Sequence, residues 1–352
     1  MRAGLTFHWM SLLWYCRPPA TTTRSPVPGP RPGAGYDPPT GRRLLLSELD
    51  RAARAERLGF AATWLVEQHR PAAGGSPDPV ALAAYVAART HRIRIGVALS
   101  LPLHADPVRI AESLAQLDVL SSGRVIAAFG PGTPAEYHLL RHDPTTAAER
   151  FRESYELILR AWTDPAPFRW DGEHHYRPHV NPWPRPWQRP HPPVWLHGPP
   201  GPFMAEAARL HRPYLLDRSW PQPSGPDPSP PLPSLAFCVP VHVAEDDRTA
   251  HAEARPHAER LLATAPAPRD LTGWAAGPAP GDMSYEALTA GGHIIVGSPA
   301  TVTARLAARA GELGADTCVT TAVATMPGPL VARGMELFAA QVMPRLQPTV
   351  TV

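Results

Sequence analysis

The feature that most restricts the fold is a repeated alternation of short apolar runs with amphipathic helical patterns. Runs typical of buried strands occur at the N-terminus and at 62–69, 93–101, 124–130, 192–198, 235–244, 293–297 and 317–323. Helical patterns occupy 47–60, 79–90, 107–121, 149–162, 203–211, 248–263, 300–314 and 330–346. Strands that alternate with helices pair in parallel, and about eight such units favour a closed barrel. We therefore predict an α/β protein, a (β/α)8 TIM-like barrel.

Two proline-rich stretches interrupt this pattern, at about 17–42 and 218–233. We interpret them as loop insertions within a single barrel domain that covers residues 1–352, because patterned segments flank each of them. They are compatible with a cover over the barrel mouth or with an extended dimer contact. After the first stretch, Ser47 and Asp50 have the spacing of a capping box, and Gly59 is a typical helix end.

Composition excludes several classes of function. The net charge of +3 gives no reason to expect a polyanion partner, and the absence of lysine excludes Schiff-base and P-loop lysine chemistry. The cysteines, Cys16, Cys238 and Cys318, are far apart, which favours a cytoplasmic protein without disulfides. We expect no signal peptide, because the apolar N-terminus is short and lacks a cleavage site, and no membrane span.

Polar residues at the carboxyl ends of the predicted strands are the candidates for chemistry. Glu67, Gln68 and His69 end one strand, the loop 130–133 follows another, and His197 lies near the end of a third. In a barrel these ends meet at one mouth, where they would form a hydrogen-bonding or proton-transfer cluster. The alternative is a strand end whose polar groups are satisfied locally.

The Gly-Pro-Gly loop at 130–132 raises a separate question. A strand that runs into a glycine loop is one way to build a phosphate cradle from backbone N–H groups. However, Pro131 has no N–H, and no basic residue lies within the loop, so a plain tight turn is the alternative. We expect no metal site, because no HExxH motif is present and His174 and His175 are adjacent.

Taken in order, the segments resemble the bacterial-luciferase-like flavin monooxygenase family. The matching stretches are AERLGFAATWLVEQH, ALAAYVAARTHRIRIGVALSLPLHADPVRIAESLAQLDVLSSGR, ERFRESYELILRAWTD, GEHHYRPHVNPWPRPWQRPHPPVWLHG, EALTAGGHIIVGSPATVTARLAARAGELGADTCV and ELFAAQVMPRL. The resemblance implies a dimeric TIM-like barrel that binds reduced FMN or, in one branch, the deazaflavin F420. It also implies a flavin C4a-peroxide formed with O₂, a small organic substrate, and a separate flavin reductase.

Carried over by position, Glu67, Gln68 and His69 match the family's Glu-His-His at the end of the second strand. There the middle histidine is associated with catalysis, but glutamine takes up no proton at neutral pH. The proton-transfer role would therefore pass to His69 or to water. Ala98 and Leu99 match the position where the family often has a strained peptide behind the flavin ring.

The resemblance also identifies the expected phosphate site. Gly130, Pro131 and Gly132 match a Gly-x-Arg-Gly segment, with Pro131 in place of the phosphate-binding arginine. After His197 and Gly198 the family has residues whose N–H groups hold the phosphate, whereas this chain has Pro-Pro-Gly-Pro at 199–202, of which Gly201 alone has an N–H. The basic residues nearest in sequence are Arg109, Arg124 and Arg141.

Three functions follow as alternatives. The first is an FMN-dependent monooxygenase that acts on a small organic or natural-product intermediate. The second is a barrel of the same fold with a lost or altered flavin site, as a flavin-independent enzyme, a binding protein or an inactive partner. The third is an F420-dependent oxidoreductase, which the altered phosphate site also disfavours.

Overall fold

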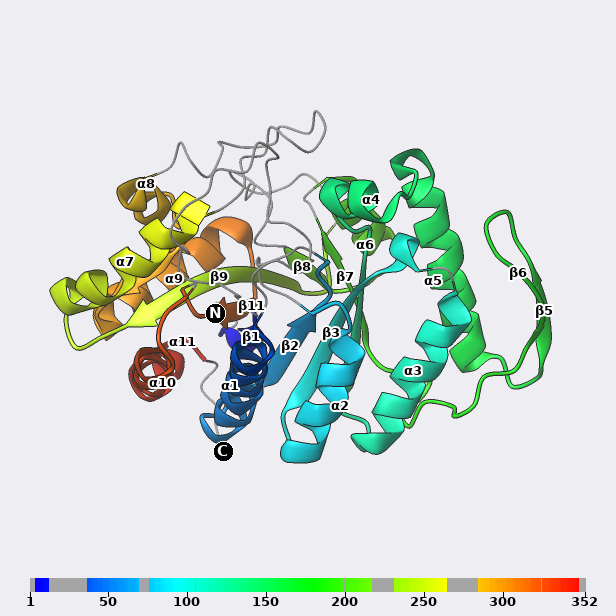
Figure 1. The fold of residues 1–352 in the computed structure, drawn as a ribbon, viewed down its shortest axis with the longest axis horizontal. Coiled ribbons are helices and arrows are strands. Elements are labelled where there is room, and N and C mark those ends of the chain that lie inside the picture. Colours follow the sequence, from blue (N-terminus) through cyan, green and yellow to red (C-terminus); the bar gives the residue numbers. More distant parts are fainter. Residues whose placement is uncertain are drawn as a thin grey trace.

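The structure is a computed structural model. It describes residues 4–12, 37–69, 76–104, 106–198, 201–216, 231–264, 284–323 and 325–347. Eight parallel strands form a closed barrel surrounded by helices (Figure 1). In spatial order they are β1 (Thr6–Ser11), β2 (Ala62–Val66), β3 (Arg94–Ser100), β4 (Val125–Gly130), β7 (Val194–Gly198), β8 (Tyr214–Leu216), β9 (Leu235–Val243) and β11 (Thr317–Thr321). Pairing of β8 with β9 and of β11 with β1 closes the ring. The predicted TIM-like barrel is confirmed.

Helices follow most of the barrel strands. The longer ones are α1 (Pro38–Arg57), α2 (Pro79–Arg89), α3 (Pro107–Leu120), α5 (Ala147–Thr163), α6 (Pro202–Arg209), α7 (Asp247–Thr264), α9 (Pro299–Leu313) and α10 (Gly328–Leu337). The short ones are α4 (Pro134–Leu140), α8 (Tyr285–Ala290), α11 (Met343–Leu346), the 3₁₀ turns η1 (Leu101–Leu103) and η2 (Pro144–Thr146), and a π-helical turn at Phe338–Val342. A hairpin of β5 (Phe168–Asp171) and β6 (Tyr176–Val180) lies outside the barrel, at the right of Figure 1.

Two apolar layers stabilise the barrel. Between strands and helices lies the larger layer, which includes Phe151, Tyr155, Ile158 and Trp162, the predicted inner face of α5. The barrel interior is filled by a second cluster around Trp64 and Trp195, whose ring centroids are 5.6 Å apart in an edge-to-face arrangement.

The barrel interior also explains one glycine. A Cβ on Gly96 would lie 2.3 Å from Cε3 of Trp64, so only glycine leaves room for this ring. The Trp64 indole N–H donates to Nδ1 of His8 over 3.0 Å. Burial, with a smaller effect of Arg94, lowers the pKa of His8 to about 3, so this imidazole is neutral. The barrel interior around Trp64 and His8 is therefore a packed core.

One predicted strand is not part of the barrel. Residues 295–297 form β10 (Ile295–Gly297), which pairs with the last three residues of β9 and with no described barrel strand beyond it. The sixth barrel strand is instead β8, whose three residues Tyr-Leu-Leu are too short to give a pattern. The predicted number of barrel strands is confirmed, but residues 295–297 were wrongly included in the barrel and β8 was missed.

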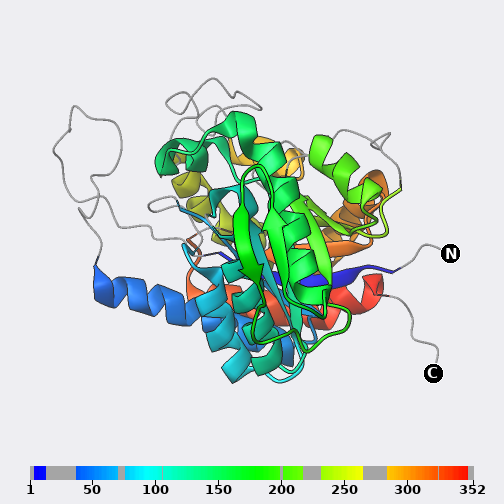
Figure 2. The same ribbon diagram turned by 90° about the vertical axis from the view of Figure 1, so that its right-hand side faces the viewer.

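The start of α1 differs from the sequence prediction. The helix begins at Pro38, and the Asp37 carboxylate caps it by accepting the N–H of Thr40 over 3.0 Å. Ser47 lies inside the helix, so the predicted capping box is wrong, and so is the insertion boundary at residue 42. Proline is tolerated in the first turn of a helix, because the N–H groups of that turn form no intrahelical hydrogen bond. Figure 2 shows α1 projecting from the body of the barrel.

Other predictions fall partly outside the described residues. Gly59 has φ +84° and follows the end of α1, as predicted. The second insertion, 218–233, and Cys16 lie largely or wholly outside the described residues. The thiols of Cys238 and Cys318 are buried, and no disulfide joins them to each other. Among the described helices, none combines the length and apolarity that crossing a bilayer requires.

Candidate functional site

The carboxyl ends of β2, β3, β4 and β7 form one rim of the barrel, here called the upper rim. Parallel register places Ser100 beside Gly130, and Val66 beside Ala98. Across this rim, Nε2 of His197 lies 3.2 Å from the carbonyl oxygen of Leu99. A Cβ on Gly130 would lie 2.4 Å from Cε1 of His197, so glycine is required for the ring to cross β4. The structure thus brings together residues from strands far apart in sequence.

Glu67 is the centre of a buried cluster at this rim. Its side chain is 1% exposed and accepts hydrogen bonds from Nε2 of His69 at 2.9 Å, Nε2 of His104 at 3.1 Å and the N–H of Ser100 at 2.7 Å. The two histidines are partly exposed. The cluster therefore combines a desolvated carboxylate with two imidazoles that solvent or a ligand can reach.

The charges of this cluster follow from its contacts. Burial raises the pKa of Glu67, but the hydrogen bonds from His104 and His69 and the charge of His104 outweigh it and bring this pKa to about 2. The hydrogen bond to Glu67 raises the pKa of His69, burial opposes it, and Glu136 adds to the increase. At neutral pH Glu67 is thus an anion.

Gln68 has a different environment from its two neighbours. Its N–H donates to the carbonyl of Ser76 over 2.9 Å. The side chains of Ala62, Trp64 and Val66 alternate towards the barrel interior, and Gln68 follows two residues after the end of β2. Of the three residues, Glu67 and His69 are joined by a side-chain hydrogen bond.

His104 was not among the residues predicted from sequence. It follows η1, directly after β3, so the same rule that selected Glu67 and His197 would have found it. Ala98 and Leu99, by contrast, pair regularly with Ala128 and Phe129. In the described residues, cis peptides occur only before Pro184 and Pro190, so the strained peptide that the resemblance implied is not found at 98–99.

The loop after β4 is already occupied by an internal anion. The Glu136 carboxylate accepts the N–H and the hydroxyl of Thr133 at 2.9 and 2.8 Å, and Thr133 in turn caps α4. The other oxygen of Glu136 accepts the N–H of His69 at 3.4 Å. Glu136 is 2% exposed, so the N–H of Thr133 in this loop is bound to a buried carboxylate. The Thr133 N–H is therefore not available to a phosphate.

The loops after β4 and β7 pack against each other. The Pro131 ring lies 3.1 Å from the place where a Cβ of Gly198 would be, and the Tyr137 hydroxyl donates to the Pro131 carbonyl. Gly132 and Gly198 have φ of +79° and +145°, conformations that favour glycine. Gly201, with φ +99°, precedes α6 without any side-chain cap. Residues 199 and 200 lie outside the described residues.

None of the arginines nearest in sequence lies free beside this loop. Arg124 binds the carbonyls of Ala87, Ile93 and Ser121 at the opposite rim, and Arg109 is paired with Glu112. Arg141 is exposed at the end of α4.

Arg150, on the first turn of α5, is the cation that the sequence did not reveal. Its Nε is completely buried, and no hydrogen bond or ion pair joins its guanidinium to any part of the chain that the structure describes. Burial raises the pKa of Tyr137, and the charge of Arg150 opposes that increase; Arg150 also adds to the lowering of the pKa of His175 that burial causes. Arg150 therefore lies near the residue that holds Pro131. A partly buried guanidinium without a partner fits an anionic group such as a flavin phosphate.

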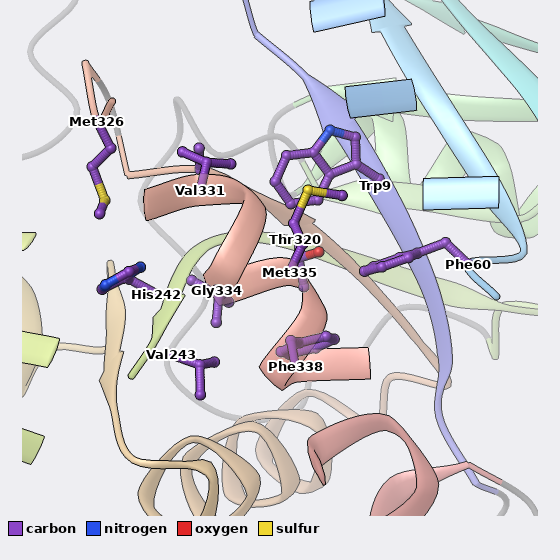
Figure 3. A pocket seen from close by; sticks show the side chains of 12 residues that line it. Trp9, Phe60, His242, Val243, Thr320, Met326, Val331, Gly334, Met335 and Phe338 are labelled. Atoms are coloured by element: carbon purple, nitrogen blue, oxygen red, sulfur yellow. The ribbon is translucent and has the colours of Figure 1, made fainter. Parts of the chain in front are cut away.

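Two other features are separate from this rim. Glu149, Glu173 and His174 have ligand atoms within 4.8 Å of one another, but both carboxylates are exposed and are not buried metal ligands. A small cavity of about 20 Å³ lies beneath α10, lined by Trp9, Phe60, His242, Met335 and Phe338 among others (Figure 3). It holds about one water molecule and is mostly apolar. Neither feature offers the chemistry of the upper rim.

Comparison with known proteins identifies the family. The sequence model for the family described as luciferase-like monooxygenase matches residues 31–317. Limonene 1,2-monooxygenase of Rhodococcus erythropolis is 36% identical over 115 residues, 32% of this chain and 30% of that protein. The F420-dependent glucose-6-phosphate dehydrogenase of Amycolatopsis mediterranei is 34% identical over 120 residues, 32% of this chain and 36% of that protein. The chain thus spans less than half of either relative.

A solved structure extends the similarity to nearly the whole chain. Monooxygenase RslO1 from Streptomyces bottropensis superposes with a TM-score of 0.74 at 26% identity, covering 97% of this chain and 99% of that one. The barrel, the order of its segments and the family match agree with one another. This chain belongs to the luciferase-like monooxygenase family.

Proposed function

We propose that this protein is a flavin-dependent monooxygenase that uses reduced FMN and O₂ to oxygenate a small organic substrate. The observation that carries the proposal is the unpaired, partly buried guanidinium of Arg150 beside the loop where the family binds phosphate. Arginine stays charged at all working pH values, and leaving it unpaired lowers stability, which a ligand phosphate would recover. Reduced flavin supplies the electrons that activate O₂ when it is bound.

The chain's own groups supply the proton chemistry. His69 donates through Nε2 to the anionic Glu67, so its Nδ1 is the atom that exchanges a proton with a ligand or water. Gln68 has an amide that donates and accepts hydrogen bonds but takes up no proton at neutral pH. We assign orientation of the ligand to Gln68 and His197, and proton exchange to His69.

The proposal includes two protein partners. The reduced flavin would come from a separate flavin reductase, as the name "oxygenase component" indicates for the related trigonelline monooxygenase of Acinetobacter baylyi. A homodimer, a cytoplasmic location and a natural-product substrate complete the proposal.

A second candidate is a barrel that does not bind a phosphorylated flavin. The buried Glu136 carboxylate favours it, because this anion occupies the Thr133 N–H of the expected cradle and repels a phosphate. The two candidates differ in one respect: whether the phosphate of FMN contributes to binding.

Anaerobic titration with reduced FMN and with reduced riboflavin tests this difference. We expect FMN to bind more tightly, and Arg150→Met to weaken FMN binding by about 10- to 100-fold while riboflavin binding stays unchanged. Arg152→Met is the matched control, because this neighbour is exposed and lies 4.0 Å from Glu206. Equal binding of both flavins to the unmodified protein contradicts phosphate recognition. Absence of binding by either flavin, or by F420 measured alongside, favours the second candidate.

A further inference from the structure

The second histidine of the Glu67 cluster has a role that the proposed function does not use. His104 lies 37 residues beyond Glu67, yet its Nε2 is 3.0 Å from Oε1 and 3.1 Å from Oε2 of the same carboxylate. His69 reaches Oε1 from the other side at 2.9 Å. Both rings are partly exposed, with side-chain exposures of 31% for His104 and 22% for His69. Two reachable imidazoles thus share one buried carboxylate.

The hydrogen bonds fix how protons are arranged on these rings. A carboxylate that also accepts the Ser100 N–H at 2.7 Å acts only as an acceptor, so both Nε2 atoms are donors. When neutral, each ring therefore keeps its hydrogen on Nε2 and leaves Nδ1 as the proton acceptor. The cluster offers two basic nitrogens and one compensating negative charge.

Electrostatics then distinguishes the first added proton from the second. The first is stabilised by Glu67, whichever ring takes it, whereas the second meets an imidazolium already bound to the same carboxylate. The other charged groups in contact are few. Glu136, from α4, faces His69, and Asp106, two residues after His104 in the sequence, caps α3 and is paired with Arg177 of β6 at 3.2 Å. None of them replaces Glu67 as the bridge between the rings.

We propose that His69 and His104 form a coupled pair that shares one added proton through Glu67, with His104 as its second proton-holding residue. The use of that proton in oxygenation rests on the proposed function, but the coupling itself does not. His104 touches no reacting group in the structure, so it is a positioning residue that sets when His69 gains or loses its proton.

NMR titration of the imidazole Cε1–H signals in flavin-free protein tests the coupling. In the unmodified protein we expect the signals of both histidines to follow two steps separated by at least about one pH unit. In His104→Gln, the glutamine amide still donates to Glu67, but His69 should follow a single step, at a pH above the lower of the two original steps. His69→Gln gives the reciprocal measurement on His104, which keeps the test independent of any one variant's folding.

A histidine on α4, outside the Glu67 cluster, provides the control for this titration. His138→Gln, at an exposed position on α4, should leave both steps unchanged. A single, identical step for His69 in the unmodified protein and in His104→Gln overturns the proposal. If flavin binding fails but the two-step titration is present, the coupling stands and only the proposed function is wrong. If the protein has monooxygenase activity, the His104→Gln substitution should shift one limb of the curve of activity against pH. The affinity for flavin should stay unchanged.

Discussion

The two rims of the barrel both contain charged groups, but the partners of these groups differ. At the lower rim, formed by the amino ends of the strands, charges are paired with backbone. Glu56 accepts the N–H groups of residues 91–93, and Arg124 donates to three carbonyls. At the upper rim, Glu67 binds two histidines, and Arg150 binds nothing that the structure describes. Charged side chains that bind backbone groups stabilise the fold. Charged side chains that bind only other side chains, or that have no described partner, remain available to a ligand.

Removal of the lower-rim arginine should have the largest effect. Arg124→Met leaves the carbonyls of Ala87, Ile93 and Ser121 without their donor, and we expect the free energy of unfolding to fall by about 3–5 kcal/mol. Urea denaturation measures it. Arg109→Met, which removes one exposed ion pair, should cost less than about 1 kcal/mol. Equal losses in the two variants would show that Arg124 is not a structural clamp.

Acid should destabilise the protein in part through the upper rim. The pKa of Glu67 is about 2 in the folded chain against 4.5 ordinarily, so the unfolded chain takes up the proton first as the pH falls. The stability that Glu67 contributes is complete above about pH 4.5 and is lost towards pH 2, amounting to about 2–3 kcal/mol. The Glu67→Gln variant should therefore lose correspondingly less free energy of unfolding over this pH range. Parallel curves for the variant and the unmodified protein would contradict the lowered pKa.

Removal of the upper-rim arginine should have the smallest effect on stability. Arg150→Met gives up no hydrogen bond in the described structure, and it removes a partly buried unpaired charge. We expect unfolding free energy to stay the same or to rise by up to about 1 kcal/mol, as is common where a group serves a ligand and not the fold. Urea denaturation of Arg150→Met beside Arg124→Met gives the direct comparison. A loss as large as that of Arg124→Met would make Arg150 structural.

The sequence predicts regular features well and contacts between distant elements poorly. Alternation of apolar residues was sufficient for the barrel and for the buried face of α5, because burial repeats along each element. It failed for β8, which is three residues long, and for the start of α1, where Pro38 and Pro39 were interpreted as loop.

At the site, position along the chain identified Glu67 and His197 but not their partners. His104 and Arg150 come from other elements, and only the closed barrel brings them to the upper rim. Glu136 had a local signal, because Thr133 and Glu136 have capping-box spacing, but its occupation of the expected cradle depends on its burial.

Glu136 has a consequence for every ligand that carries a negative charge. A carboxylate joined to its own binding site by three residues competes there as an intramolecular ligand, at an effective concentration far above that of a free metabolite. Free phosphate or a soluble acid would not displace it. The upper rim therefore selects against small anions, and a ligand that binds there must gain its affinity from several contacts at once.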